Sequence, residues 1–469
     1  MRKFIVVLFC SILSVNALGQ EAESERSKSL PYYLSKVVDS NPEVQASWRD
    51  LQIAVYDVDI ARSGYRPKVD AVASTGYTDR NYGLDRQYAG HTARLALSQM
   101  LYDGFFTRSE VRRFRQAQIV RYYELLGEIE QKSLDTTLSY MDVKLFRELL
   151  LLAEQNLVTH VSVFKQIEES VEAGVGRRAD LEQISGRLSL AESNVLTELS
   201  NLHDVTARFL RLVGEKPAQE LTGVTFTYQF DSTPDDLRRT LLHAYENNPA
   251  FNAAVFNIDS QRYAVDSARS RYQPQVNFSV SYGTQTRDEA GLDNTITEAR
   301  VGLDISINLY NGGADRAAVR QALSRVDRAK DVRVKACIDM RQTIQIARND
   351  IINISRQLPS LNAHRLSSDR VKSAYMDQFT LGNRSLLDLL DSENEYYESS
   401  RAYIQAKYTL EKAKARLLAS SGILAREFGI VKQHIADVLK TAEKVPRFNP
   451  EHVCPPITTA FSDEANILT

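Results

Sequence analysis

The sequence predicts a mainly α protein with a small β part, in which a helix-hairpin-helix unit occurs twice. Three observations support this fold class: motifs recur at offsets of 207 or 208 positions, long stretches lack Gly and Pro, and short stretches alternate apolar and polar residues. Alternation with a period of two indicates strands, whereas long amphipathic stretches indicate helices.

The duplication defines the predicted domain organisation. Asn41-Pro42 opens one helical stretch and Asn248-Pro249 opens another, 207 positions later, while Tyr102-Asp103-Gly104 recurs as Tyr310-Asn311-Gly312. A recurrence this long predicts two structural repeats. We expect a signal peptide at 1–19, a first repeat at 20–213 with a strand pair at 67–102, a linker at 214–236, a second repeat at 237–421 with a strand pair at 274–310, and a tail at 422–469.

Each repeat contains two stretches that alternate like strands, and the clearest covers 299–309. One face of this stretch is apolar and the other carries polar residues such as Arg300 and Asp304. If the strand lies in a membrane, the apolar face meets lipid. The lipid-facing candidates are Val301, Leu303, Ile305 and Ile307. The two hairpin tips are predicted near 79–90 and near 287–297.

The long Gly-poor stretches predict unusually long helices at 105–173 and 314–380, with shorter helices at 35–64 and 177–213. A strict seven-residue apolar repeat, which indicates a left-handed coiled coil, follows Gly174 and again follows Gly382. An ordinary amphipathic helix packed on a core is the alternative. Small residues share one seam of the second copy: Ser392, Ser399, Ala406, Ala413 and Ser420. Because proline disrupts a helix, we expect a kink or break near Leu358, before Pro359.

Composition and the N-terminus limit the function and the location. With 58 Lys+Arg against 60 Asp+Glu, the 469-residue chain has no basic excess for nucleic acid. Arg2 and Lys3 precede a short apolar run and a small-residue site, which is typical of a secretory signal peptide; a membrane anchor is the alternative. Cys337 and Cys454 have neither the spacing of a disulfide framework nor that of a metal site. An exported chain of this kind is periplasmic, secreted or an outer-membrane β-barrel.

Four strands cannot close a barrel, and an open sheet leaves unpaired edges. Several chains would therefore have to contribute their strands to one barrel. Two, three or four chains would give about eight, twelve or sixteen strands, all within the range of membrane barrels. The residues alone do not choose among these numbers.

The order of helix, hairpin, Tyr-x-Gly strand end, long helix and glycine-marked turn resembles the TolC-type outer-membrane efflux family from about Leu30 to Gly422. The run from Phe379 to Glu395 is similar to members that serve type I secretion systems. The resemblance implies a homotrimer in the outer membrane, with a shared transmembrane β-barrel of four strands per chain and a long coiled-coil α-barrel in the periplasm. The implied partners are a periplasmic adaptor (membrane fusion protein), an inner-membrane ABC transporter and outer-membrane lipid.

The resemblance also assigns site residues at the narrow end of the tube. It implies that Asp388 and Asp391 line a pore constriction and that Asp180 and Arg384 form gate links. Phe379 occupies an aromatic gate position where other members carry tyrosine. The turn glycines Gly174, Gly176 and Gly382 are the implied adaptor contacts. Without the family, Asp388 and Asp391 are typical of solvated carboxylates in a first helical turn.

No pattern in the sequence predicts an enzyme, a cofactor or a metal site. The Gly174-Val-Gly176-Arg-Arg-Ala179 pattern follows a helix, whereas a dinucleotide site needs a preceding strand. The leading hypothesis is a passive export duct for a protein. The alternatives are a multidrug or metal efflux duct and, from another class, a periplasmic coiled-coil adaptor outside the membrane. The second strand pair argues against that adaptor.

Overall fold

The computed structural model describes residues 27–79, 81, 87–224, 226, 234–289, 292–430 and 454. These residues form two compact units, and each unit combines segments of both repeats. The helical unit contains 27–47, 125–249 and 337–430, and the sheet unit contains 48–124, 250–336 and 454. The predicted signal peptide at 1–19 and most of the predicted tail at 422–469 lie outside the described residues.

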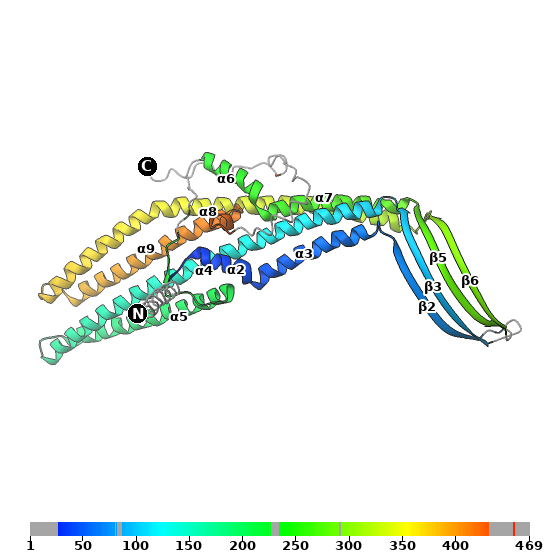
Figure 1. Cartoon of the computed structure of the whole chain (residues 1–469). Helices are drawn as coiled ribbons and strands as arrows, with labels where there is room; N and C mark the ends of the chain where they lie inside the picture. The colour runs from blue at the N-terminus through cyan, green and yellow to red at the C-terminus, as the bar shows by residue number, and fades with distance from the viewer. Residues whose placement is uncertain are drawn as a thin grey trace, which may run out of the picture. The chain divides into compact units, whose positions relative to one another are not determined.

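The helical unit contains two antiparallel helix pairs, one from each repeat (Figure 1). In the first pair the end of α4 (Phe106–Glu172) runs beside α5 (Arg178–Val213). In the second pair the end of α8 (Ala314–Thr380) runs beside α9 (Leu386–Ser420). The predicted long helices and glycine-marked turns are therefore confirmed. The unit also contains α2 (Leu30–Ser40), α6 (Pro234–Asn247) and α10 (Leu424–Glu427).

Large and small side chains share the buried side of α9. Leu389 and Leu417 of the seven-residue repeat are buried, and so are the small residues Ser399 and Ala413. Small side chains at a contact allow two helix backbones to approach closely. Glu148 of α4 accepts hydrogen bonds from Lys407 and Tyr408 of α9, so α9 packs against α4 as well as α8.

An aromatic cluster closes the first repeat at the junction of α2, α4 and α5. The Tyr33 ring lies 4.9 Å from the Phe209 ring and 6.0 Å from the Tyr140 ring, centroid to centroid. All three side chains are fully buried. Burial of rings this large contributes several kcal/mol, on the order of 3 to 5 kcal/mol lost on truncation to alanine.

The Asn-Pro pairs mark equivalent corners of the two repeats. Asn41 separates α2 from α3 (Pro42–Ser63), and its side-chain amide donates to the carbonyl of Leu212 at 3.1 Å. Asn248 separates α6 from α7 (Pro249–Arg269), and its amide donates to the carbonyl of Ser420 at 2.8 Å. In both repeats this asparagine holds the end of the last long helix.

The sheet unit contains four antiparallel strands in the order β2-β3-β5-β6 (Figure 1). They are β2 (Lys68–Asp79), β3 (Gln87–Tyr102), β5 (Gln275–Glu289) and β6 (Leu292–Ser306). A 3-10 turn, Ser270–Tyr272, precedes β5. Within the described residues β2 and β6 each pair on one side only. The sheet therefore has two open edges.

Several boundaries differ from the prediction. β6 ends at Ser306, so Ile307 lies beyond the strand, and the ladder pairs residues up to Glu289 and Leu292, which shortens the predicted tip at 287–297. The polar residues placed in that tip pair instead, because backbone pairing does not require apolar side chains. A short parallel pair that the sequence did not predict joins β1 (Ser27–Lys28) to β4 (Glu220–Leu221), inside the predicted linker.

The structure corrects two further expectations. α8 continues from Ala314 to Thr380 with Pro359 inside it, so the helix does not break near Leu358; a kink at this position stays a prediction. One missing N–H removes a single bond from a ladder of 67 residues, and the turns on either side remain bonded. Cys337 and Cys454 are both disulfide-bonded, although their sequence spacing suggested no disulfide.

Candidate functional site at the two helical turns

Each helix pair ends in a glycine turn that reverses the chain. Gly174 adopts a φ of +76° and Gly382 a φ of +77°, a region that glycine enters without a steric cost. The N–H of Gly176 donates to the carbonyl of Ser170 at 2.8 Å, and a Cβ at Gly176 would lie 2.8 Å from the backbone nitrogen of Val171. Backbone geometry alone therefore accounts for these three glycines.

A hydrophobic cluster from all four long helices lies behind the turns. Its buried members are Val163, Ile167, Ile184, Leu386, Leu389 and Leu390. Phe379, the predicted aromatic gate residue, is half-buried and packs against this cluster. Within one chain Phe379 is thus part of the packing that fixes the two turns relative to each other.

Arg384 makes all of its described contacts within the second helix pair. Its Nε donates to Oε1 of Gln378 at 2.9 Å, its guanidinium lies 4.2 Å from the centre of the Tyr375 ring, and it lies 3.8 Å from Asp388. The single chain does not bring Arg384 to Asp180, which lies in the first turn of α5. The aromatic ring beside Arg384 is Tyr375, one helical turn before Phe379.

Asp388 is held at the start of α9 by a serine cap. The backbone N–H of Asp388 donates to Oγ of Ser385 at 3.2 Å, and the Ser385 hydroxyl donates to Asp388 Oδ2 at 2.8 Å. The first of these bonds satisfies one free backbone donor of the first helical turn, and the second joins the cap hydroxyl to the Asp388 carboxylate. Arg177, at the corresponding start of α5, makes no side-chain cap hydrogen bond. The second turn is therefore the more rigidly built of the two.

Asp391 pairs with a residue that the sequence analysis did not identify. Arg187 of α5 lies 3.4 Å from Asp391 of α9, so the contact joins the two repeats. The Asp391 side chain is 63% exposed and that of Arg187 is 33% exposed. An exposed pair contributes little to stability, about 0 to 1 kcal/mol. Arg187 and Asp391 are 204 positions apart, so no local pattern in the sequence predicts this pair.

A buried carboxyl lies next to these charges. Glu393 is buried in α9, and burial raises the pKa of its carboxyl, although Lys372 lowers it and Asp369 raises it further. Lys372 lies over the Tyr396 ring, 3.9 Å from its centre. Because Glu393 precedes Tyr396 by three positions, both side chains lie on one face of α9. The second helix pair thus combines buried and exposed carboxylates near one turn.

Further along the helices, charged pairs join α9 to the first repeat. Arg401 lies 2.8 Å from Glu198 of α5, and the Glu198 side chain is 2% exposed. Lys412 of α9 pairs with Asp142 of α4. Charge-assisted bonds are stronger when they are shielded from water. These contacts hold the two helix pairs together above the turns.

Residues that pair directly across the sheet share a face, and the register confirms the predicted alternation. Leu95 pairs with Tyr282, which pairs with Ala299, so the odd-numbered residues of β6, including Val301, Leu303 and Ile305, lie on an apolar face. The opposite face carries Arg94, Glu298, Arg300 and Asp304. Asp304 accepts a hydrogen bond from Ser279 at 2.7 Å on that polar face.

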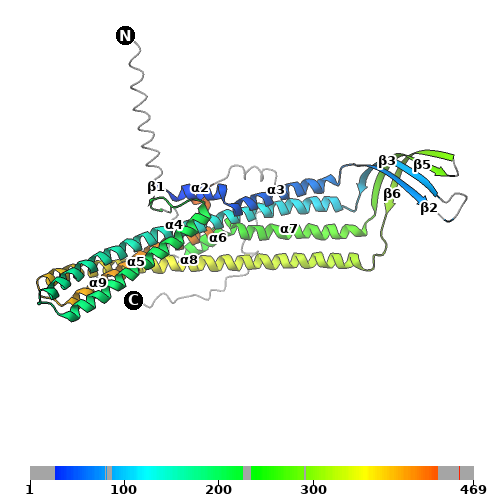
Figure 2. The same ribbon diagram turned by 90° about the horizontal axis from the view of Figure 1, so that it is seen from below.

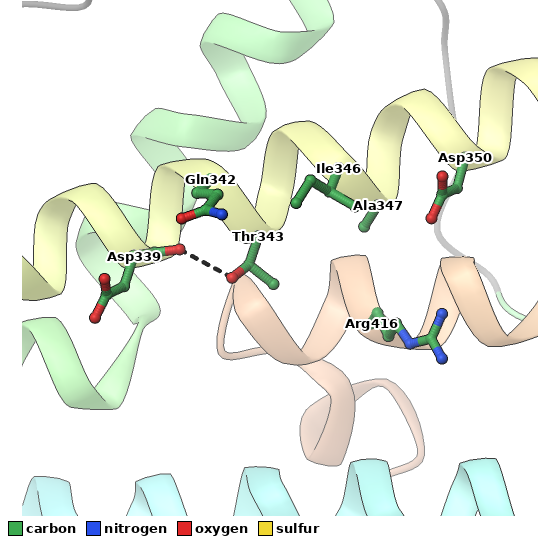
Figure 3. Close-up of a pocket in the computed structure, with 7 residues that line it drawn as sticks. All are labelled: Asp339, Gln342, Thr343, Ile346, Ala347, Asp350 and Arg416. Carbon is green, nitrogen blue, oxygen red and sulfur yellow. Dashed lines mark hydrogen bonds between the residues drawn. The ribbon is translucent and has the colours of Figure 1, made fainter.

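A cavity of about 450 Å³ lies between α8 and α9 in the helical unit (Figure 3). Asp339 and Asp350 of α8 and Arg416 of α9 supply its charged groups, and the Thr343 hydroxyl donates to the carbonyl of Asp339 at 2.9 Å. No His or Cys lines it. The cavity offers charge but no nucleophile paired with a base.

The described residues contain no group of three or more His, Cys, Asp or Glu side chains arranged to hold a metal ion. Among their helices, none combines the length and the apolar character that a membrane crossing requires.

The sequence model of the outer membrane efflux protein family matches residues 33–215 and 241–423. The chain is 26% identical over 416 residues to the outer membrane efflux protein BepC of Brucella suis, covering 86% of this chain and 87% of BepC. It is 22% identical over 488 residues to the outer membrane protein TolC of Escherichia coli, covering 99% and 94%. It is 26% identical over 361 residues to the alkaline protease secretion protein AprF of Pseudomonas aeruginosa, covering 74% and 73%.

Solved structures of outer membrane channels have the same fold as this chain. The CmeC outer membrane channel of Campylobacter jejuni superimposes with a TM-score of 0.74 at 15% identity, covering 86% of this chain and 90% of CmeC. The two ranges that the family model matches, 33–215 and 241–423, overlap the two predicted repeats.

Proposed function

We propose a function for this chain from the family to which it belongs, the outer membrane efflux protein family, whose model matches it over both repeats. The chain forms the trans-periplasmic duct of a type I secretion system for a protein substrate. The protein belongs to the outer membrane and extends into the periplasm. The run from Phe379 to Glu395 supports the secretion role, as does the likeness to a relative named for alkaline protease secretion. The duct works without catalysis.

The main support for a shared duct is the sheet with two open edges. β2 and β6 are antiparallel to their inner neighbours, and an even number of strands per chain lets β6 of one copy pair antiparallel with β2 of the next. The apolar faces must coincide, so odd-numbered residues of β2 pair with odd-numbered residues of β6. Three chains then form a homotrimer whose barrel has no free edge.

In the same arrangement one face of the sheet contacts lipid and the other contacts the water-filled lumen. Val301, Leu303 and Ile305 face lipid, with Ile307 just beyond the strand at the membrane boundary, while Arg94 and Arg300 face the lumen. In the described chain both faces of this sheet are exposed to solvent. An exposed apolar face of this length needs lipid to cover it.

The second turn supplies the gate. Asp388 and Asp391 form a ring of carboxylates at the constriction, and Arg384 reaches Asp180 of a neighbouring copy when the tube is closed. The cluster of Tyr375, Gln378 and Asp388 around Arg384 supports this role, because it fixes the guanidinium at the exposed end of the hairpin. Phe379 sets the position of this cluster through its packing.

The turns themselves contact a periplasmic adaptor, which links the duct to an inner-membrane ABC transporter. Val175 is 82% exposed and Leu381 is 75% exposed, each beside a turn glycine. Exposed apolar side chains on a tight turn favour contact with another protein. Gly174, Gly176 and Gly382 allow a close backbone approach at this surface.

Single-channel recording of the trimer in planar bilayers tests the gate. Arg384→Ser should raise conductance, because each lost charge-assisted link stabilises the closed state by about 1.5 to 3 kcal/mol and is repeated in every copy. Asp388→Ala with Asp391→Ala should instead lower cation selectivity, since these residues supply ring charge. Glu411→Gln, away from the turns, is the control. Unchanged conductance and unchanged selectivity would refute the gate assignment.

A second experiment separates secretion from efflux. Deleting the gene for this chain in its host should abolish the secretion of specific proteins into the culture medium, as measured by mass spectrometry of the medium. The alternative, a multidrug or metal efflux duct, predicts normal secretion with increased sensitivity to toxic compounds or metal salts. Restoring the wild-type chain should reverse whichever defect appears.

A further inference from the structure

A group of basic side chains surrounds the end of the sheet where the strands meet the long helices. We call it the basic collar; its members are Arg66, Arg108, Arg112, Arg316 and Arg320. Arg66 lies just before β2, Arg108 and Arg112 lie in the first turns of α4, and Arg316 and Arg320 lie in the first turns of α8. All four strands join helices or the 3-10 turn at this end (Figure 2).

The collar is exposed and lacks internal counterions. All five side chains are exposed, and none forms an ion pair with another described residue. Four acidic residues of the region already have partners within the chain: Asp59 with Arg62, Asp266 with Arg269, Asp315 with Arg271, and Asp103 with Thr107. The positive charge of the collar is therefore free to attract an anion from outside the chain.

The arginine pairs occur in both repeats. Arg108 and Arg112 recur as Arg316 and Arg320, each shifted by 208 positions. Like charges four positions apart on a helix repel and destabilise it slightly. An anion bound between the two arginines would remove this repulsion in both repeats.

Aromatic side chains border the collar on the strand side. Tyr102 and Phe105 stack edge to face with their centroids 5.5 Å apart, and Arg108 lies 6.0 Å from the centre of the Phe105 ring. Phe105 has a φ of +66°, a region that a large side chain occupies only at a cost. In the second repeat Tyr310 is 85% exposed at the corresponding place. Aromatic rings beside cationic groups match the border between hydrocarbon and headgroups.

We propose that the basic collar binds the phosphate groups of anionic phospholipids in the periplasmic leaflet of the outer membrane. The inference rests on the proposed function, because the sheet must lie in the membrane to bring the collar to the headgroups. Arginine forms bidentate hydrogen bonds with phosphate. The attraction acts within a Debye length, about 8 Å at physiological ionic strength, so only residues next to the membrane surface contribute.

Lipid retention by the full-length trimer tests the proposal. The trimer is incubated with mixed phosphatidylglycerol and phosphatidylcholine, and bound lipid is counted by native mass spectrometry. The test variant is Arg108→Gln, Arg112→Gln, Arg316→Gln and Arg320→Gln together, with Arg316→Gln plus Arg320→Gln as a milder form. The matched control is Arg325→Gln plus Arg328→Gln, exposed residues of the same helix about 14 and 18 Å farther along it than Arg316.

The wild type and the control should prefer phosphatidylglycerol, and the fourfold variant should lose about tenfold in that preference. High salt should remove the preference of the wild type. Equal lipid preference in the wild type and the fourfold variant would overturn the proposal. Displacement of the lipid by millimolar inorganic phosphate would also overturn it, because that result would indicate a site for free anions. A loss of anion conductance in the fourfold variant would overturn it as well, because that result would place the arginines in the lumen. If the protein forms no channels at all, the proposed function fails as well.

Discussion

The two repeats end their last long helices with the same asparagine bond but secure the following segment in opposite ways. After α5, Glu215 lies next to Lys28 at 3.5 Å and Lys36 at 2.5 Å, and these lysines lower the pKa of Glu215 against the effect of burial. After α9, Glu130 accepts hydrogen bonds from the N–H groups of Leu424 and Ala425 at 3.1 and 3.2 Å. Burial raises the pKa of Glu130 to about 7.

The difference shows how a duplicated scaffold acquires separate roles. The backbone elements that form the fold, such as the turn glycines and Asn41 and Asn248, are present in both repeats. The charged side chains are shared only in part: Asp180 corresponds to Asp388, but Arg384 has no counterpart in the first turn, where Gly176 occupies the equivalent position and Arg177 follows it. The backbone of the two turns is therefore alike, whereas the arrangement of their charges differs between the repeats.

The largest expected effect tests the symmetry of the sheet. Leu95→Arg and Leu303→Arg alter equivalent positions on the apolar face, and each should destabilise the protein in a bilayer by about 2 to 4 kcal/mol. Ser98→Arg and Ser279→Arg, on the polar face, are the matched controls and should be mild. Urea unfolding of the refolded trimer in lipid vesicles measures both. Equal tolerance on the two faces would contradict a lipid-facing apolar side.

The next effect separates the two repeat ends by pH. Folded Glu130 binds its proton more tightly than the unfolded chain does, so its contribution to stability is full at low pH and is lost as the pH rises through about 7. Between pH 5 and pH 8 the free energy of unfolding of the wild type should fall by on the order of 2 kcal/mol relative to that of Glu130→Gln. Glu215 has the opposite sign, because its lowered pKa makes its contribution disappear as the pH falls. Urea midpoints of Glu130→Gln and Glu215→Gln at both pH values check the signs; parallel pH profiles would rule out the contrast.

The smallest effect concerns the shared asparagine. Asn41→Ala and Asn248→Ala should each cost about 1 to 2 kcal/mol, since each frees a helix-end carbonyl. Asn41 should cost somewhat more, because its side chain also accepts a hydrogen bond from the N–H of Glu43 at 2.9 Å. Asn→Asp at either position keeps the acceptor and loses the donor. Thermal unfolding of the four variants ranks these contributions. If neither alanine variant lowers the melting temperature, the asparagine bond does not stabilise the end of the helix.

Much of the fold follows from the sequence because its signals are local. Alternation located the four long strands, and glycine turns located the ends of the helix pairs. The β1–β4 pair escaped prediction because two residues are too few to show a period. Pro359 misled because a long helix tolerates one missing bond.

Less of the candidate site could be predicted, since its contacts join distant segments. Arg384 was identified by resemblance, and its partner Asp388 follows at helical spacing. Arg187 and the buried Glu198 gave no signal, because their partners Asp391 and Arg401 lie in the other repeat. Tyr375 was overlooked because its ring becomes relevant only when the turn brings Arg384 back over it.

The bond between Glu130 and Leu424 also constrains how the chain folds. It spans 294 positions, and the contact between Asp142 and Lys412 spans 270. Contacts this distant form slowly, because a long loop must close before they stabilise anything. The helical unit therefore cannot be completed during export until almost the whole chain has arrived. Until then its apolar helix faces stay uncovered, which makes the unfinished chain prone to aggregation.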